Sequence, residues 1–357
     1  MEVSDNIYDV AVVGGYSWSN YGDEITYYAL YYLLSVQWNK KVIMVNWTKD
    51  ALWPVYQYPV LFQNSPYPEN AIAPEYNTLE DLMELNDKTN CFLVGSGQFV
   101  KPGILMATNR LCLLEWVADE KKKIAYAASW GHDFVQLKNR EKIRQKIAYN
   151  RFDAFAVRER SAVKLAEREF GISAEWVLDP VFLCDRKMYD NIIGTRNLRQ
   201  KEIFVYILDP SKEKEHIVTY LSEKLRIPYK IITAGSRSAK SAKDLWDLEV
   251  LEYARLESWL LYLRDAEYII ADSFHATCLA IIFKKQFTTI LNPNRGAARF
   301  ESFLEYLGLT SRLLCQTDDM SNNLDRHIQE KIDYNKVDIL LNKMKDKSIQ
   351  YLKSKLT

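Results

Sequence analysis

Cysteine is scarce in this sequence and follows no binding pattern. The chain of 357 residues has five cysteines, an odd number, and none of them forms a CxxC pair. This argues against a disulfide framework and against a zinc site. A surplus of one charge is also lacking, because lysine plus arginine and aspartate plus glutamate number 47 each. No overall field therefore attracts nucleic acid or an anionic membrane, and an anionic ligand would have to be held by local charges.

Long apolar runs and a leader-like beginning are missing as well. No stretch reaches the roughly 18 apolar residues that a membrane-spanning helix needs, and the acidic start MEVSDNIYD lacks the basic and apolar sections of a secretory signal. We therefore expect a soluble, cytoplasmic protein. The lysine-rich residues 319–357 are predicted to be helical. This tail would either pack back on the rest of the chain or touch the inner face of the cell membrane.

Strand-like apolar runs alternate with amphipathic segments of helix length over most of the chain. The runs are YDVAVVGG, KVIMVNW, CFLVGSG, KKIAYAASWG, FDAFAVRE, IFVYILD, YKIITAG and EYIIADS. This alternation predicts an α/β fold in which helical crossovers join parallel strands. A chain of this length, 48% of it apolar, is too long for one ordinary core, so we expect two domains.

The predicted domain boundary lies at the polar stretch DRKMYDNIIGTRNLRQKE, which has little periodicity and fits a linker. We predict an N-terminal α/β domain over residues 1–184, a linker over 185–200, a second α/β domain over 201–318, and a C-terminal helix over 319–357 that packs back on the first domain. Within the first domain, WPVYQYPVLFQNSPYPENAIAP is rich in proline and tyrosine. We expect no regular element there, and a loop that contacts a ligand.

Glycine and polar residues follow several of the predicted strands. Two open α/β sheets that face each other place the C-terminal ends of their strands at the crevice between them, where ligands bind. The loops Gly14–Glu24, Gly95–Gln98 and Ser129–Asp133 are therefore candidate sites. Their glycine spacing is not that of a dinucleotide-binding loop, but free N–H groups before a helix would bind an anion or a sugar oxygen. A tight structural turn is the alternative for the first loop.

The segment Asp272–Thr277 joins an apolar strand to an apolar helix and contains His275. A helix N-terminus disfavours the imidazolium ion, whereas a bound phosphate favours it, so His275 is a candidate proton donor to an anionic substrate. Arg158 precedes a helix, and Arg295 and Arg299 lie in a later loop. Arginine suits a carboxylate or phosphate because its planar fork donates two hydrogen bonds. A structural histidine and solvated surface arginines are the competing interpretations.

Taken in order, these segments resemble the polysaccharide pyruvyl transferase family. The matching stretches are GYSWSNYGDEITYYAL, FLVGSGQ, IAYAASWG, VRERSAVKL, VLDPVFL, AEYIIADSFHATCLAIIFKKQF and NPNRGAARFESFLEYLGL. The resemblance implies two Rossmann-like domains facing across a cleft, as in glycosyltransferase-B folds, with the acceptor on the first and phosphoenolpyruvate on the second. It implies that a pyruvyl group passes from phosphoenolpyruvate to two hydroxyls of a sugar during biosynthesis of a surface polysaccharide such as a capsule or exopolysaccharide. No metal or other cofactor is implied, and the expected acceptor is a lipid-linked oligosaccharide.

The resemblance also suggests roles for individual residues. The family histidine falls on His275 and its anion-binding arginine on Arg158. Ser273, of the SFH form found in many bacterial members, stands where other relatives have an arginine, and Gly97 stands where relatives often have aspartate. The candidate residues are His275, Asp23 and Asp133 for catalysis, with Glu24 as a further possible base; Arg158, Ser273, Arg295 and Arg299 for phosphoenolpyruvate; and Tyr16, Asn20, Ser96, Gln98, Trp130 and His132 for the sugar.

Two alternatives remain open. The first is a glycosyltransferase of the same architecture that uses a nucleotide sugar, with the nucleotide held by Ser236, Arg237 and Glu249. The second is a non-catalytic carbohydrate-binding relative of the enzyme, because Ser273 and Gly97 depart from the residues that other members of the family carry.

Overall fold

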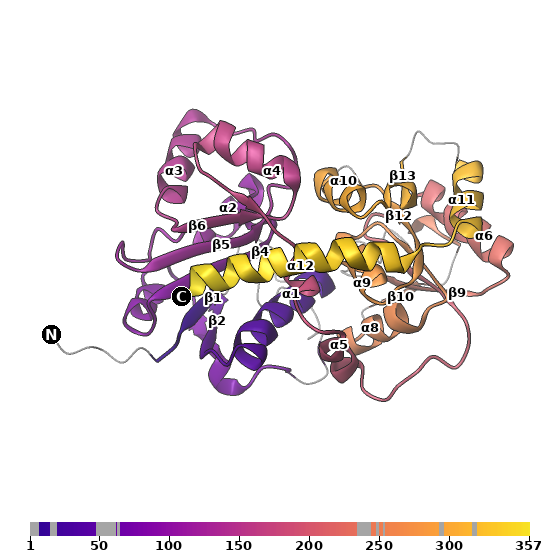
Figure 1. Ribbon diagram of the computed structural model, residues 1–357, viewed down its shortest axis with the longest axis horizontal. Coiled ribbons are helices and arrows are strands. Elements are labelled where there is room, and N and C mark those ends of the chain that lie inside the picture. Colours follow the sequence, from indigo (N-terminus) through magenta and orange to yellow (C-terminus); the bar gives the residue numbers. More distant parts are fainter. Residues whose placement is uncertain are drawn as a thin grey trace.

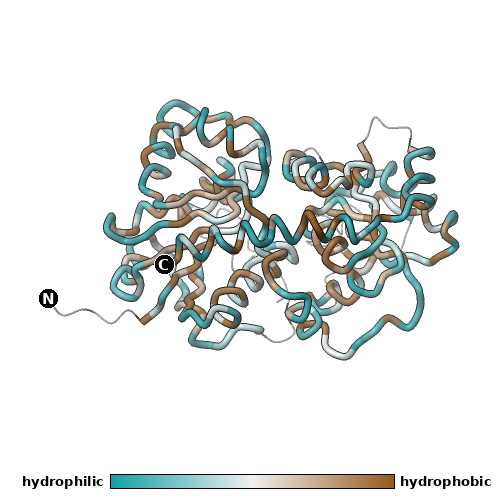
Figure 2. Tube along the Cα trace, in the orientation of Figure 1, coloured by the Kyte–Doolittle hydropathy of each residue, from teal (hydrophilic) through white to brown (hydrophobic). Residues whose placement is uncertain are grey.

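A computed structural model of the chain describes residues 7–14, 20–47, 62, 65–233, 244–247, 250–252, 254–292, 296–315 and 320–357. The chain forms two α/β lobes that lie side by side, and one long C-terminal helix runs across both (Figure 1). In Figure 2 the hydrophobic residues gather in the sheets inside each lobe, while hydrophilic residues dominate the outer helices and loops. The expected mixed α/β architecture with parallel sheets is therefore present.

The first lobe is built on a parallel sheet with the strand order β3-β2-β1-β4-β5-β6-β7 among the described residues. The strands are β1 Val10–Val13, β2 Val42–Trp47, β3 Ile72–Tyr76, β4 Cys91–Gly97, β5 Lys122–Ala128, β6 Ala154–Val157 and β7 Glu175–Trp176. Strands β1 and β4 are buried along their whole length, because helices cover both faces of a parallel sheet. This explains why they occur as continuous apolar runs rather than as an alternating pattern.

The second lobe repeats this plan with the strand order β10-β9-β8-β11-β12-β13. Its strands are β8 Ile203–Tyr206, β9 Tyr229–Thr233, β10 Val250–Glu252, β11 Tyr268–Ala271, β12 Gln286–Ile290 and β13 Leu313–Leu314. All of their pairings are parallel. In each sheet the order reverses beside the first strand, which is the place where doubly wound folds bind their ligands.

Helices connect these strands. They are α1 Tyr21–Tyr31, α2 Pro102–Ala107, α3 Asn139–Tyr149, α4 Arg160–Leu165, α5 Arg186–Ile193, α6 Lys212–Leu225, α8 Leu256–Asp265, α9 Phe274–Ile282, α10 Ala297–Tyr306, α11 Met320–Gln329 and α12 Tyr334–Leu356. The two lobes share a hydrophobic contact, since the ring of Tyr21 in α1 stacks on Trp259 in α8 with centroids 5.1 Å apart. This contact holds the start of α1 against the second lobe.

Two local expectations from the sequence were wrong. The proline-rich segment ends in a regular element, because β3 begins at Ile72 and includes Pro74. Proline is tolerated there because β3 is the edge strand of its sheet, so an N–H can be missing on the open side. The polar stretch expected to lack periodicity contains helix α5, which buries Met188 and Ile193.

Helix α12 contacts both lobes in turn. Near its beginning, Leu340 accepts a hydrogen bond from the Tyr306 hydroxyl of the second lobe at 3.0 Å. Further along, the Ser348 hydroxyl accepts a hydrogen bond from the backbone N–H of Leu178 at 2.9 Å. At its end, the backbone oxygen of Thr357 accepts one from Lys122 in the first lobe. The helix therefore fastens the two lobes together (Figure 1).

Candidate active site

The carboxylate of Asp179 lies at the centre of a buried polar cluster. Its Oδ2 accepts hydrogen bonds from Arg158 Nη1 at 2.6 Å and from Ser96 Oγ at 3.1 Å. Its Oδ1 accepts hydrogen bonds from Thr26 Oγ1 at 3.4 Å and from the backbone N–H of Val181 at 3.2 Å. Burial alone would raise the pKa of this carboxyl, but hydrogen bonds and charge from His275 and Arg158 outweigh burial and hold it well below its usual range. Asp179 is therefore a fixed anion.

His275 extends this cluster from the second lobe. Its Nε2 lies 3.1 Å from Thr26 Oγ1 and 3.5 Å from Asp179 Oδ2. Arg158 Nη1 lies 3.4 Å from the same nitrogen, so three side chains of the first lobe surround Nε2. The Nδ1 side of the ring meets α1, where a β carbon at Gly22 would lie only 2.1 Å from Nδ1. Glycine is thus required at this position for the two lobes to meet.

The topology explains why these side chains converge. Arg158 directly follows β6 and His275 lies in the first turn after β11. Asp179 comes shortly after β7 and caps the 3₁₀ turn that follows it. Because parallel strands all end at the same edge of their sheet, residues after different strands meet at that edge. The cluster therefore lies where the C-terminal edges of the two sheets face each other.

Two buried guanidinium groups lie beside the cluster. The guanidinium carbons of Arg158 and Arg299 are 4.8 Å and 5.2 Å from the centroid of the Phe274 ring. Arg158 is 3% exposed and Arg299 is 9% exposed. Burial, and then the charge of Arg158, lower the pKa of Arg299 to about 9. Burial and repulsion from Arg158 therefore destabilise the positive charge of Arg299, and a bound anion would stabilise this cation.

The family model for polysaccharide pyruvyl transferases matches residues 20–294, most of the chain. The chain belongs to this family. The match includes the segments that carry Arg158, Asp179 and His275. No curated protein matches the sequence.

Solved structures with a similar fold share little sequence with this chain. The UDP-N-acetylglucosamine 2-epimerase of Rickettsia bellii has a TM-score of 0.55 at 14% identity, with 97% of this chain and 96% of that chain covered. The UDP-GlcNAc 2-epimerase of Neisseria meningitidis has a TM-score of 0.53 at 11% identity, with 97% and 98% covered. The O-GlcNAc transferase of Thermobaculum terrenum has a TM-score of 0.51 at 9% identity, with 99% of this chain but 65% of that chain covered. These neighbours show the glycosyltransferase-B-like fold that the sequence led us to expect.

Several residues expected to bind the sugar have other contacts. Trp130 is 1% exposed, and its ring stacks on Phe155 and Phe170 with centroids 5.8 Å and 5.6 Å away. Since aromatic rings cover it, the assignment of Trp130 to the acceptor is corrected: it is a core residue. Ser96 is 1% exposed and donates its hydroxyl to Asp179, so it supports the cluster rather than facing an acceptor.

Asn20, Gln98 and His132, which were also expected to bind the sugar, belong to the first lobe. Asn20 caps helix α1, with its side-chain oxygen accepting the Gly22 N–H at 2.9 Å. Gln98 lies against Gly131, where a β carbon would come 2.3 Å from the Gln98 Nε2. His132 is partly exposed. Burial first and then the charges of Lys101 and Arg299, outweighing that of Asp133, lower the pKa of this imidazole.

The residues expected to act as bases or to bind the donor lie in different surroundings. Asp23 lies in the first turn of α1 beside Gly22, and its charge acts on Arg299. Asp133 is exposed, and its backbone oxygen is bound by Arg168. Ser273 is the buried N-cap residue of α9. Tyr16 and Arg295 lie outside the described residues, as do Ser236, Arg237 and Glu249 of the nucleotide-binding alternative.

Sequence reasoning missed the central residues of the cluster. Asp179 appeared only within the matching stretch VLDPVFL, and Thr26 and Glu159 received no role. Glu159 is buried and accepts hydrogen bonds from Ser129 Oγ at 2.9 Å and the Gly131 N–H at 3.4 Å, which fixes the loop before His132. The available signal was position, since a carboxylate just after a parallel strand faces the crevice.

Two observations bear on bound ions and membranes. Within the part of the chain that the structure describes, no group of histidine, cysteine and carboxylate side chains is arranged to hold a metal ion. No helix in that part is both long and apolar enough to span a bilayer.

Proposed function

We propose that the protein transfers the pyruvyl group of phosphoenolpyruvate to two hydroxyls of one sugar during assembly of a surface polysaccharide, without a metal or other cofactor. The observation that carries this proposal is the placement of two buried arginines: Arg158 lies beside His275, and both Arg158 and Arg299 lie against the ring of the neighbouring Phe274. Phosphoenolpyruvate carries a carboxylate and a phosphate close together. Two guanidinium groups and an acid are the groups that such a donor needs.

The donor fits the hydrogen-bonding capacity of Arg158. Its Nη1 is engaged by Asp179, but its buried Nε has no hydrogen-bond partner among the described residues. Buried donors are nearly always satisfied in folded proteins, so an oxyanion at this position would complete the arginine. Arg299 would bind the same donor, and the anion would offset the burial and the repulsion that lower its pKa.

The chemistry assigns the proton transfer to His275. The acid protonates the methylene carbon of phosphoenolpyruvate, and one sugar hydroxyl attacks the resulting cationic carbon. Phosphate then leaves, and the second hydroxyl closes the ketal. The methylene carbon gains one proton from the enzyme and becomes a methyl group. Of the two hydroxyl protons released, one returns to the enzyme and the other goes to the departing phosphate. Thr26 and Asp179 hold the ring at Nε2 and Gly22 packs against it at Nδ1, so the imidazole has a fixed orientation from which to act on the donor.

Asp179 and Thr26 act through His275 rather than on the substrate. The buried carboxylate and the hydroxyl beside Nε2 fix the orientation of the ring. For the base that accepts the hydroxyl proton, we propose Asp23, because it shares the first helical turn with Gly22 and acts on Arg299. Asp133 fits this role less well because it is exposed to solvent.

The acceptor would enter from the first lobe, past Gln98 and His132, and we propose a lipid-linked oligosaccharide. The Neisseria meningitidis epimerase structure was solved with UDP-GlcNAc bound. A nucleotide-sugar donor is therefore the alternative that the test must separate from phosphoenolpyruvate. A cleft that binds the donor without turnover would instead support the non-catalytic relative.

The decisive experiment measures binding of phosphoenolpyruvate and of UDP by calorimetry to the wild type, Arg158→Lys and Arg168→Lys. Arg158→Lys keeps the charge but loses the fork, so phosphoenolpyruvate should bind about tenfold or more weakly. Arg168 is 58% exposed and serves as the matched control. Binding of UDP alone, or unchanged binding of phosphoenolpyruvate to Arg158→Lys, would refute the donor assignment.

A further inference from the structure

Helix α3 presents an unusual face to solvent on the outside of the first lobe. Arg140, Ile143, Arg144 and Ile147 are all exposed and are spaced i, i+3, i+4, i+7, so they form one stripe along the helix. The two isoleucines are 60% and 63% exposed. The opposite face buries Gln145, Ala148 and Tyr149 in the lobe. Apolar side chains thus lie on the face that a soluble helix normally makes polar.

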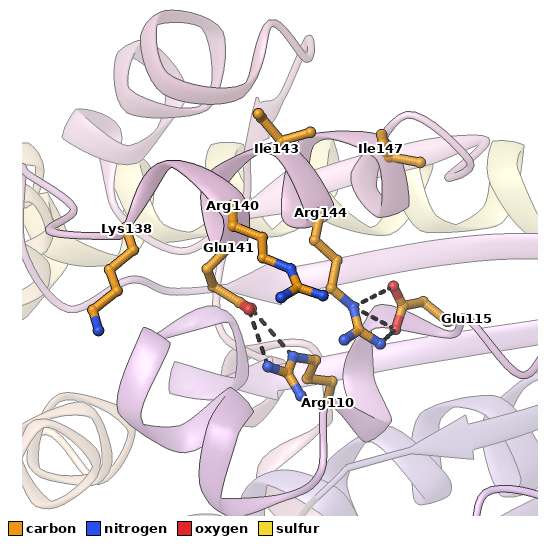
Figure 3. A pocket seen from close by; sticks show the side chains of 8 residues that line it. All are labelled: Arg110, Glu115, Lys138, Arg140, Glu141, Ile143, Arg144 and Ile147. Atoms are coloured by element: carbon orange, nitrogen blue, oxygen red, sulfur yellow. Dashed lines mark hydrogen bonds and ion pairs between the residues drawn. The ribbon is translucent and has the colours of Figure 1, made fainter.

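Cationic side chains lie near these isoleucines and outnumber the acidic ones. Figure 3 shows a hollow lined by Arg110, Glu115, Lys138, Arg140, Glu141, Ile143, Arg144 and Ile147. Its two carboxylates are already engaged, because Glu141 binds Arg110 at 3.0 Å and Glu115 binds Arg144 at 2.5 Å. Lys138 and Arg140 take part in no ion pair within the described part of the chain. The hollow therefore has two cations left over beside two exposed apolar side chains.

We propose that this α3 face docks on a membrane surface that contains anionic phospholipid. Exposed isoleucines at i and i+4 would enter the headgroup region, while Lys138 and Arg140 would contact lipid phosphates. The surplus charge is local, since the whole chain carries a formal net charge of +0. Two isoleucines are also too few for the core of a stable protein interface, which typically buries about 800 Å² on each partner.

The position of this face relative to the active site adds to the argument. The loop from Ser129 to Lys138 connects strand β5 to helix α3. It contains Gly131 and His132 at the crevice, and Phe134 in the same loop is 53% exposed. A membrane bound to α3 would thus be joined by a single short loop to the side of the crevice where the acceptor is proposed to enter.

The test is sedimentation of the full-length protein with vesicles of phosphatidylcholine alone or mixed with phosphatidylglycerol. We expect binding only to the mixed vesicles, weakened by salt. Each of the variants Ile143→Ser/Ile147→Ser and Lys138→Glu/Arg140→Glu should weaken it about tenfold or more. The matched controls are Ile339→Ser, at a position 71% exposed on α12, and Lys343→Glu on the same helix, which should bind like the wild type.

Three outcomes would overturn the proposal. The first is that the wild type fails to sediment with any vesicle, and the second is that the α12 controls lose as much binding as the α3 variants. The third is that Ile143→Ser/Ile147→Ser changes the mass of the free protein in solution without changing vesicle binding, which would make α3 a contact between copies of the chain. Far-ultraviolet circular dichroism confirms that each variant is folded. Because the vesicles contain neither donor nor acceptor, the result is independent of the proposed pyruvyl transfer.

Discussion

Gly22 and His275 fit against each other with no space for a side chain between them. A β carbon on Gly22 would come 2.1 Å from Nδ1 and 2.8 Å from Cγ of the imidazole. Contacts below about 3 Å are prohibitive, so the ring would have to move if any other residue stood at this position. The first turn of α1 therefore fixes the orientation of the His275 ring from one side, and Asp179 with Thr26 fixes it from the other.

Gly22→Ala should consequently impair turnover more than donor binding. The added methyl group displaces the imidazole from Asp179, and a small misplacement of a catalytic group can cost about a hundredfold in rate. Steady-state kinetics should show a fall in kcat with a smaller change in the KM for phosphoenolpyruvate. Gly103→Ala is the matched control, because a β carbon there meets nothing within 4 Å. Equal kcat values for the two variants would show that the ring tolerates the methyl group.

Asp179 should make the stability of the protein fall in acid. Its pKa is lowered in the folded state, although burial opposes this, because His275 and Arg158 stabilise the anion. The unfolded chain has a pKa near about 3.9 for aspartate and so binds the proton first. The stabilisation is complete above that pH and is lost as pH falls towards the folded value, by up to about 1.4 kcal/mol per pH unit.

Asp179→Asn should remove this contribution. At neutral pH the variant should be less stable by about 3 kcal/mol, since it leaves Arg158 buried without its anion. Urea unfolding measured from pH 7 down to acid should show the unfolding free energies of the wild type and Asp179→Asn converging as pH falls. Parallel curves would mean that Asp179 does not titrate differently in the folded and unfolded states.

Arg299→Met should separate stability from ligand binding. Burial and repulsion from Arg158 lower the pKa of Arg299 to about 9, so the free protein carries a destabilised cation. An apolar side chain of similar length should raise the stability of the free protein by about 1 kcal/mol. The melting temperature should nevertheless no longer rise on addition of phosphoenolpyruvate.

The control for this experiment is Arg168→Met, on the exposed surface. It should leave both the melting temperature and its response to phosphoenolpyruvate unchanged. If Arg299→Met lowered the stability and kept the response to the donor, Arg299 would be a structural residue outside the donor site.

Among the apolar side chains of helix α12, the buried ones should contribute to stability and the exposed ones should not. Leu352 is 0% exposed and belongs to the main hydrophobic core, so Leu352→Ala should cost about 2–5 kcal/mol. Ile339 on the same helix is 71% exposed, and Ile339→Ala should change the unfolding free energy by less than about 0.5 kcal/mol. Denaturant unfolding measures both values, and equal losses would show that α12 packs differently.

Much of the fold was predictable from the order of residues along the chain. Continuous apolar strands are a local signal, because each strand of a covered parallel sheet buries both faces, and their alternation with helices indicated the α/β architecture. The stretch around Pro74 was misread because proline forbids central strands only, and the edge position of β3 depends on the neighbours it pairs with.

The site was only partly accessible from the sequence. Position after a strand indicated Arg158 and His275 as candidates, because the ends of parallel strands face the crevice. The tertiary structure alone decided that Asp179 binds Arg158 and faces His275, since residues far apart in the sequence meet there through the packing of two sheets. It also decided that Trp130 is enclosed by Phe155 and Phe170, because the burial of a side chain depends on distant partners that no local pattern specifies.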